Sequence, residues 1–216
     1  MSVDSAARVI YLAIGLLVGL VAHEYAHAWV ATRLGDQTPR LQGRLTFNPR
    51  PHLDPFGSLI LPGILLLIVL FGGNPLVFAY AKPQELNPWS LRRADHHSTL
   101  IALAGPAANV VLAFVFGALW RIGLSGEASK LVADCLIANV ILASMNLMPI
   151  PPLDGARVVA RFLSPRAREV FTNLEQYGAL FMLLIFFIIS GPIFTFVRVI
   201  GNGICQLVAG ADCLAG

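Results

Sequence analysis

Long apolar runs alternate with basic, proline-containing loops along the chain. The first run, residues 9–31, has 23 residues and would extend about 35 Å as a helix, enough to span a bilayer. Residues 98–120, 135–153 and 176–197 form three further runs. A secretory signal peptide would have a shorter apolar stretch than residues 9–31, a basic region before it and a small-residue cleavage site after it. The pattern therefore predicts an all-α polytopic membrane protein with about four transmembrane helices.

A fifth apolar run, residues 56–71, is shorter and is interrupted by Pro62-Gly63. A broken run of this length favours a re-entrant segment, which enters and leaves the membrane on the same side, over a full crossing. The polar stretch before it, residues 38–50, contains Gly43 and Asn48-Pro49. These turn-forming residues favour a short β-hairpin.

The loops between the runs carry most of the positive charge and so predict the orientation. Of the 15 Lys and Arg residues, 11 lie in residues 32–55, 74–97 and 154–175. The positive-inside rule places these loops in the cytoplasm, and both termini are then outside. We expect one membrane-embedded domain over residues 1–216, with a core (9–160), a last span (176–197) and a short tail (201–216).

The composition supports the membrane assignment and disfavours several other classes. The chain is 56% apolar and only 12% charged, with a net charge of +3, whereas soluble domains carry about 25% charged residues. This disfavours a disordered chain, a nucleic-acid-binding protein and most soluble enzymes. Cys135 is expected to be buried. Cys205 and Cys213 are close enough in sequence to pair if the tail faces an oxidising compartment, but three cysteines do not make a disulfide framework and the sequence favours unpaired thiols.

Three ionisable residues occupy one turn of the first predicted span. His23 and His27 are four residues apart and so share a helix face, and with Glu24 they form the H-E-x-x-H pattern of zinc peptidases. In that pattern the two imidazoles bind the metal and the glutamate acts as general base. The alternative is a pair of helix-packing histidines with a paired glutamate. Ionisable groups in lipid are costly without a ligand, which favours the zinc site.

A catalytic zinc ion needs a third protein ligand from another segment. The candidates are Asp134, Glu175 and Asp154. Asp154 lies in the stretch 146–155, whose three prolines cannot continue a helix and predict an extended arm. The spacing alone leaves open whether Asp154 is a ligand or a solvated helix cap. The depth of His23, about 12 Å from the cytoplasmic end of its run, favours the ligand, because Asp154 also lies at a cytoplasmic end.

Three motifs, in this order, resemble the site-2 protease family of intramembrane zinc metalloproteases. They are His23-Glu24-Tyr25-Ala26-His27, Gly105-Pro106-Ala107-Ala108-Asn109 and Asn146-Leu147-Met148-Pro149-Ile150-Pro151-Pro152-Leu153-Asp154-Gly155. The resemblance covers roughly residues 9–160. Residues 43–62 and 78–88 are similar to the compact bacterial branch of the family, which has no PDZ or CBS domain.

The resemblance implies the roles of individual residues. His23, His27 and Asp154 would bind one Zn²⁺ per chain, Glu24 would activate water, and Asn146 would help to hold the substrate or the oxyanion. Asn146 could equally form an interhelical hydrogen bond.

The resemblance also implies an activity. The chain would be a zinc-dependent endopeptidase that cleaves a single-span membrane-protein substrate within its transmembrane segment. The protein would lie in the lipid bilayer of the bacterial inner membrane, with its active site near the cytoplasmic side.

Asn109 is expected to link helices, and His52 and Asp54 are expected to lie in a wet loop. No motif specifies the substrate or an oligomeric state.

Two other functional classes fit the sequence less well than a protease. A transporter would need ionisable residues along several spans, but apart from Asp134 they gather around residues 23–27 and 154, which favours a site over a conduit. A catalytically inactive relative that only binds membrane helices would have no reason to keep both zinc-binding motifs.

Overall fold

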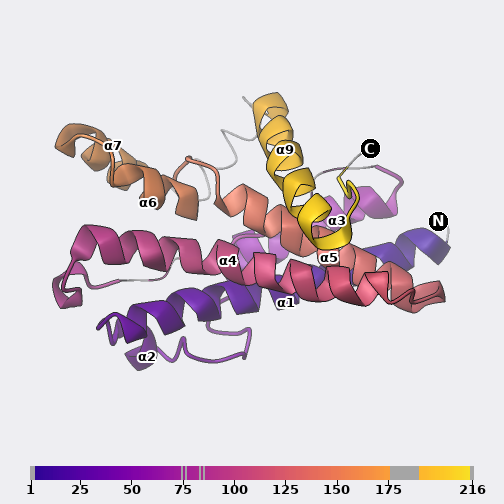
Figure 1. The fold of residues 1–216 in the computed structure, drawn as a ribbon, viewed down its shortest axis with the longest axis horizontal. Helices are drawn as coiled ribbons and strands as arrows, with labels where there is room; N and C mark the ends of the chain where they lie inside the picture. The colour runs from indigo at the N-terminus through magenta and orange to yellow at the C-terminus, as the bar shows by residue number, and fades with distance from the viewer. Residues whose placement is uncertain are drawn as a thin grey trace.

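The structure is a computed structural model that describes residues 3–73, 75, 77–82, 84, 86–175 and 190–214. Within these residues every regular element is helical (Figure 1). The elements are α1 (Val3–Arg33), α2 (Thr38–Leu41), η1 (Pro55–Ile60), α3 (Leu61–Leu70), η2 (Pro88–Ser90), α4 (Ala94–Arg121), α5 (Gly126–Asn146), α6 (Asp154–Ala160), α7 (Pro165–Glu175) and α9 (Ser190–Ala209).

Four helices, α1, α4, α5 and α9, are long and apolar enough to cross a membrane. The spans predicted at 9–31 and 98–120 are confirmed as α1 and α4. The span predicted at 135–153 instead begins at Gly126 and ends at Asn146. The prediction began too late because it required an uncharged run, and the first turns of α5 contain charged residues. A helix can include such residues where it extends beyond the apolar region.

The fourth predicted span, 176–197, coincides with the described chain only at its end. Residues 176–189 lie outside the described residues, and the remainder begins α9. In Figure 1, α1, α4 and α5 run alongside one another, whereas α9 crosses them steeply. A single stripe of α9, which includes Ile193, Val197 and Cys205, is buried against these helices.

The predicted β-hairpin is wrong. Residues 38–50 contain α2 followed by turns, and the described parts of the chain contain no strand. Gly43, with φ of +69°, reverses the chain after α2. The Thr46 hydroxyl then accepts from the Asn48 N–H, and the Asn48 side chain accepts from the Arg50 N–H, at 3.1 Å each. These local bonds occupy backbone donors that a strand ladder would need.

The predicted re-entrant segment is a short helical unit. It consists of the π-helical turn η1 continued by α3, and Asp54 caps its start by accepting from the N–H groups of Phe56 and Gly57 at 3.0 and 2.7 Å. The unit is apolar, but it is shorter than the four candidate spans. That it enters and leaves on the same side of the membrane stays a prediction.

Helices α1 and α5 pack unusually close together. A Cβ atom at Gly15 would lie 2.9 Å from the Ala138 Cβ, and one at Gly19 would lie 2.7 Å from a Leu142 methyl and 2.8 Å from the Asn139 Oδ1. Small residues spaced four apart allow this approach in membrane helices, where packing rather than water exclusion drives association. Leu12 and Leu16 of α1 add to the same core.

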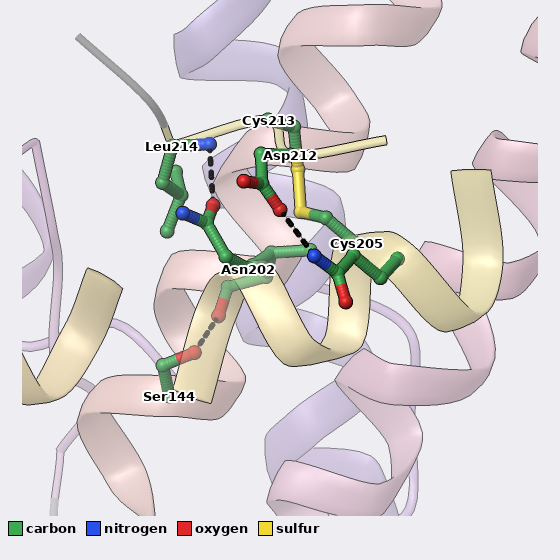
Figure 2. Close-up of a disulfide and its surroundings, with 8 residues drawn as sticks. Ser144, Asn202, Cys205, Asp212, Cys213 and Leu214 are labelled. Carbon is green, nitrogen blue, oxygen red and sulfur yellow. Dashed lines mark hydrogen bonds between the residues drawn. A yellow bond between two sulfur atoms is a disulfide. The ribbon is translucent and has the colours of Figure 1, made fainter. Parts of the chain in front are cut away.

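The C-terminal tail folds back onto α9. Cys205 and Cys213 form a disulfide, shown in yellow in Figure 2, so the pairing that the sequence disfavoured is present in the structure. The Asn202 Oδ1 accepts from the Leu214 N–H at 2.9 Å and fixes the end of the tail. Cys135 is a buried free cysteine, as expected.

We expect Gly19→Ala to lower the free energy of unfolding by about 1–3 kcal/mol, because the added methyl group overpacks the α1–α5 contact. Gly203→Ala is the matched control. A Cβ there meets nothing within 4 Å, so the better helix former should raise stability by up to about 1 kcal/mol. Thermal unfolding in detergent measures both effects, and equal shifts for the two variants would contradict the packing argument.

Candidate metal centre

Three buried side chains from two helices converge on one point. His23 and His27 lie on successive turns of α1, and Asp154 is the first residue of α6. Their Nε2 atoms are 3.0 Å apart, and the Asp154 Oδ2 lies 3.0 Å from that of His23 and 3.1 Å from that of His27. The exposed fractions of the three residues are 5%, 6% and 9%. The structure thus brings together the three residues that the sequence suggested as metal ligands.

The outer nitrogen of each imidazole is held by an acceptor on α4. The His23 Nδ1 lies 2.7 Å from the Asn109 Oδ1, and the His27 Nδ1 lies 2.7 Å from the Ile101 carbonyl oxygen. The Asn109 amide orientation follows from its other end, where Nδ2 donates to the Gly19 carbonyl at 3.0 Å. Each Nδ1 therefore carries the hydrogen, and each Nε2 presents its lone pair to the centre.

The atoms at the centre fit a metal ion. Two imidazole lone pairs and a carboxylate oxygen face one another at 3.0–3.1 Å, and such acceptors repel unless a cation lies among them. Two nitrogens and one oxygen, with a fourth position open, are a ligand set of catalytic zinc. Their spacing is close to the roughly 3.3 Å expected between ligands of a tetrahedral zinc ion with bonds of about 2.0–2.1 Å.

Asp154 reaches the histidines through a folded arm. Residues 147–153 form turns rather than the predicted extended chain, with hydrogen bonds from the Met148 N–H to the Met145 carbonyl and from the Leu153 N–H to the Ile150 carbonyl. A Cβ atom at Gly155 would overlap the carbonyl oxygens of Leu147 and Met148 at the start of the arm. The absence of a side chain at Gly155 therefore allows the tight fold that delivers Asp154.

Glu24, the candidate general base, is buried on the same turn of α1 as His23. Only 7% of it is exposed, and its Oε2 lies 3.9 Å from a guanidinium nitrogen of Arg44, itself buried. The carboxylate thus has a cationic partner on the loop after α2.

Asn146 is the last residue of α5, and its role stays a prediction. Its Nδ2 donates to the Leu142 carbonyl, one turn back in the same helix, at 3.0 Å. No hydrogen bond among the described residues joins Asn146 to His23, Glu24, His27 or Asp154. One of its two amide hydrogens remains for another acceptor.

Other residues considered from the sequence lie elsewhere or serve the fold. Asp134 is paired with Arg8 at 3.9 Å, and the Glu175 side chain lies outside the described residues. The expectation of a wet loop is wrong for His52, which is fully buried with its Nε2 2.9 Å from the Thr46 carbonyl oxygen. Nearby, burial raises the pKa of Tyr80 to about 12, and the Asp54 charge adds to the shift, so this phenol stays neutral.

The sequence reasoning missed the residues that orient the histidines. Asn109 links helices as expected, since it also donates to the Asn139 Oδ1 at 3.1 Å, but its contact with His23 was not foreseen. A Cβ atom at Gly105 would overlap both imidazole rings, so this glycine makes room for the centre. A lone amide side chain in an otherwise uncharged apolar run was the available signal for Asn109.

Comparison with known proteins identifies the family. Residues 124–190, which include Asn146 and Asp154, match the family model described as Peptidase family M50. YwhC of Bacillus subtilis, named as a candidate zinc metalloprotease, is 35% identical over 186 residues, which are 82% of this chain and 80% of YwhC. The chain belongs to peptidase family M50. It is therefore a zinc-dependent protease, and its apolar helices make it a multi-pass membrane protein.

Two further relatives carry the same kind of name. Rip2 of Mycobacterium tuberculosis is 34% identical over 176 residues, which are 80% of this chain and 64% of Rip2. MJ0611 of Methanocaldococcus jannaschii is 45% identical over 142 residues, which are 65% of this chain and 64% of MJ0611. This M50 peptidase thus spans slightly less than two thirds of these two relatives. No solved structure matches the chain.

We expect purified M50 peptidase to contain one zinc ion per chain, and His23→Ala to lose most of it because two protein ligands hold the ion poorly. Elemental analysis after purification in detergent measures the content. His96→Ala is the control, since His96 is exposed near the start of α4. Full zinc content in the His23 variant would refute the ligand assignment.

Asn109→Leu should weaken zinc binding about 10–100-fold, because it removes the acceptor that fixes the His23 ring. Asn109→Asp keeps an oxygen acceptor for His23 but loses the donor to the Gly19 carbonyl, so it should weaken zinc binding less than Asn109→Leu does. Competition with a chromophoric chelator measures the affinities, and Asn173→Leu on the exposed face of α7 serves as control. Equal affinity in the Leu variant and the wild type would remove Asn109 from the site.

Proposed function

We propose that this M50 peptidase is an intramembrane endopeptidase that cleaves a single-span membrane protein within its transmembrane segment. The depth of the candidate metal centre carries the proposal. His23 lies ten residues before Arg33, the end of α1, which corresponds to about 15 Å of helix. The helix around it is one of the four apolar enough to cross a membrane. A centre at this depth suits a substrate that is itself in the membrane.

The residues divide the chemistry between them. His23, His27 and Asp154 would hold the zinc ion, which would supply Lewis acidity for the attack of water on the scissile carbonyl. Glu24 accepts a proton from the attacking water and transfers it to the leaving nitrogen. The free amide hydrogen of Asn146 donates to the developing oxyanion.

The substrate has to unwind before it can be cut. A peptide bond inside an intact helix is shielded by its own turn, and its carbonyl is hydrogen-bonded. Glycine, proline, asparagine and serine lower the cost of unwinding because they are weak helix formers. Preferred substrates therefore carry such residues near the cut.

The active site lies near the cytoplasmic side of the cell membrane in this proposal. The positive loops flank the end of α1 that carries the histidines, which supports this orientation. The position of the disulfide also supports this orientation, because the disulfide lies toward the opposite end of α4 from the histidines. Cys205 packs against Ala113 in the second half of α4, beyond the Ile101 and Gly105 positions that contact the histidines. Disulfides persist in oxidising compartments such as the periplasm.

The test is cleavage of single-span substrates in proteoliposomes, with the cut mapped by mass spectrometry. The cut should fall inside the apolar segment, nearer its cytoplasmic end. Glu24→Gln should reduce cleavage at least about 100-fold, because it removes the proton acceptor. Replacement of helix-breaking residues near the cut by leucine should slow cleavage of that substrate.

His96→Ala provides the matched control and should cleave like the wild type. Cuts confined to extramembrane loops would reject the intramembrane assignment. Undiminished cleavage by the Glu24 variant would reject the role of the base.

A further inference from the structure

The loop that follows α2 folds back onto the turn of α1 that carries the candidate base. The Phe47 ring stacks on the Tyr25 ring, with centroids 4.3 Å apart and planes at 21°. The Arg44 guanidinium lies 3.9 Å from the Glu24 carboxylate. Glu24 and Tyr25 are consecutive, so both contacts hold the same turn. The loop is therefore anchored beside the metal centre at two points.

Arg44 is itself held from a second direction. Its Nη1 donates to the Lys82 carbonyl at 3.2 Å, and the Lys82 N–H donates to the His52 carbonyl at 2.9 Å. His52 in turn bonds the Thr46 carbonyl through its side chain, which closes the loop on itself. The segment that places the guanidinium beside Glu24 is thus held by several hydrogen bonds.

Arg44 and Glu24 are both buried, which indicates that their contact matters to the structure. Arg44 is only 5% exposed, although arginine is among the residues least often buried. A buried guanidinium is strongly unfavourable unless it is paired and hydrogen-bonded. Glu24 is equally buried and would otherwise be an isolated charge beside two imidazoles. Each of the two side chains therefore provides a reason for the burial of the other.

We propose that Arg44 is a positioning residue that holds the Glu24 carboxylate in place for proton transfer, an assignment that rests on the function proposed above. In the H-E-x-x-H pattern the glutamate directly follows the first histidine, so it projects from the helix beside the face that carries the ligands. Its side chain has three torsions that must be fixed. A displacement of about 1 Å can lower a rate about 100-fold. The planar, permanently charged guanidinium restricts the carboxylate without competing for the proton.

The first test separates positioning from folding and metal binding. In proteoliposomes, Arg44→Gln should lower kcat about 10–100-fold while KM and zinc content stay at wild-type values. Arg44→Lys should recover part of the loss, because it restores the charge but not the planar guanidinium. Arg50→Gln, an exposed change in the same loop, should have no effect. Wild-type kcat in Arg44→Gln, or zinc loss parallel to the loss of kcat, overturns the proposal.

The second test does not depend on activity. In the zinc-free protein, Arg44→Gln should lower Tm by at least about 5 °C, because it leaves the buried Glu24 carboxylate without this cation. Glu24→Gln should lower Tm by less, because Arg44 keeps its bond to the Lys82 carbonyl. The double variant should be more stable than the sum of the two shifts predicts. If the wild-type protein cleaves its substrate but the two Tm shifts are additive, the role of Arg44 is overturned and the proposed function stands. If the wild-type protein cleaves no substrate, the proposed function itself is overturned.

Discussion

Three acceptor atoms that face one another inside an apolar helix bundle form the constraint on which the rest of the structure depends. The nitrogens of His23 and His27 and the Asp154 carboxylate lie within 3.1 Å of one another and are shielded from water. Apolar packing cannot stabilise such a group, because each lone pair needs a hydrogen-bond donor or a cation opposite it. The surrounding helices therefore have to be rigid enough to hold the acceptors together before a cation binds.

The bundle meets this requirement through small residues and one amide side chain. Gly15 and Gly19 bring α1 against α5, and Gly105 brings α4 against the imidazole rings. At the junction of the three helices Asn109 is fully buried and bonds α1 twice, through His23 and the Gly19 carbonyl. The helix packing and the tautomer of a ligand are thus set by the same side chain. A substitution at this point disturbs the fold and the metal chemistry together.

The features that could be predicted from the sequence are those with a local period. The spans of α1 and α4 followed from apolar length, and the shared face of His23 and His27 followed from helical spacing. The contact between Asn109 and His23, which are 86 residues apart in the chain, was missed. The hairpin failed because the side chains of Thr46 and Asn48 satisfy the nearby backbone donors, a choice that polarity alone does not reveal.

Two buried loop residues show the same limit of sequence reasoning. His52 and Arg44 lie in a polar stretch that indicates exposure, yet both are buried, and the backbone of Lys82 bonds both of them. Periodicity predicts which helices exist, but it does not show what covers a loop. The pairing of Asp154 with the two histidines could be predicted for a different reason. The motifs that contain these residues are specific, and both lie near a cytoplasmic end of their apolar runs.

The separation of the ligands along the chain links metal binding to the integrity of the whole core. The histidines and Asp154 are 127 residues apart, counted from His27, and the chain between them forms α4, α5 and the folded arm. A cation bound only by the assembled set stabilises the native state and not the unfolded one. The same linkage applies in reverse, because any loosening of the α1–α5 contact moves the histidines relative to the arm. Burial of the centre in the bundle thus provides a preorganised site of low polarity, in which electrostatic stabilisation of a transition state is strong. It also links the stability of the bundle to the retention of the metal.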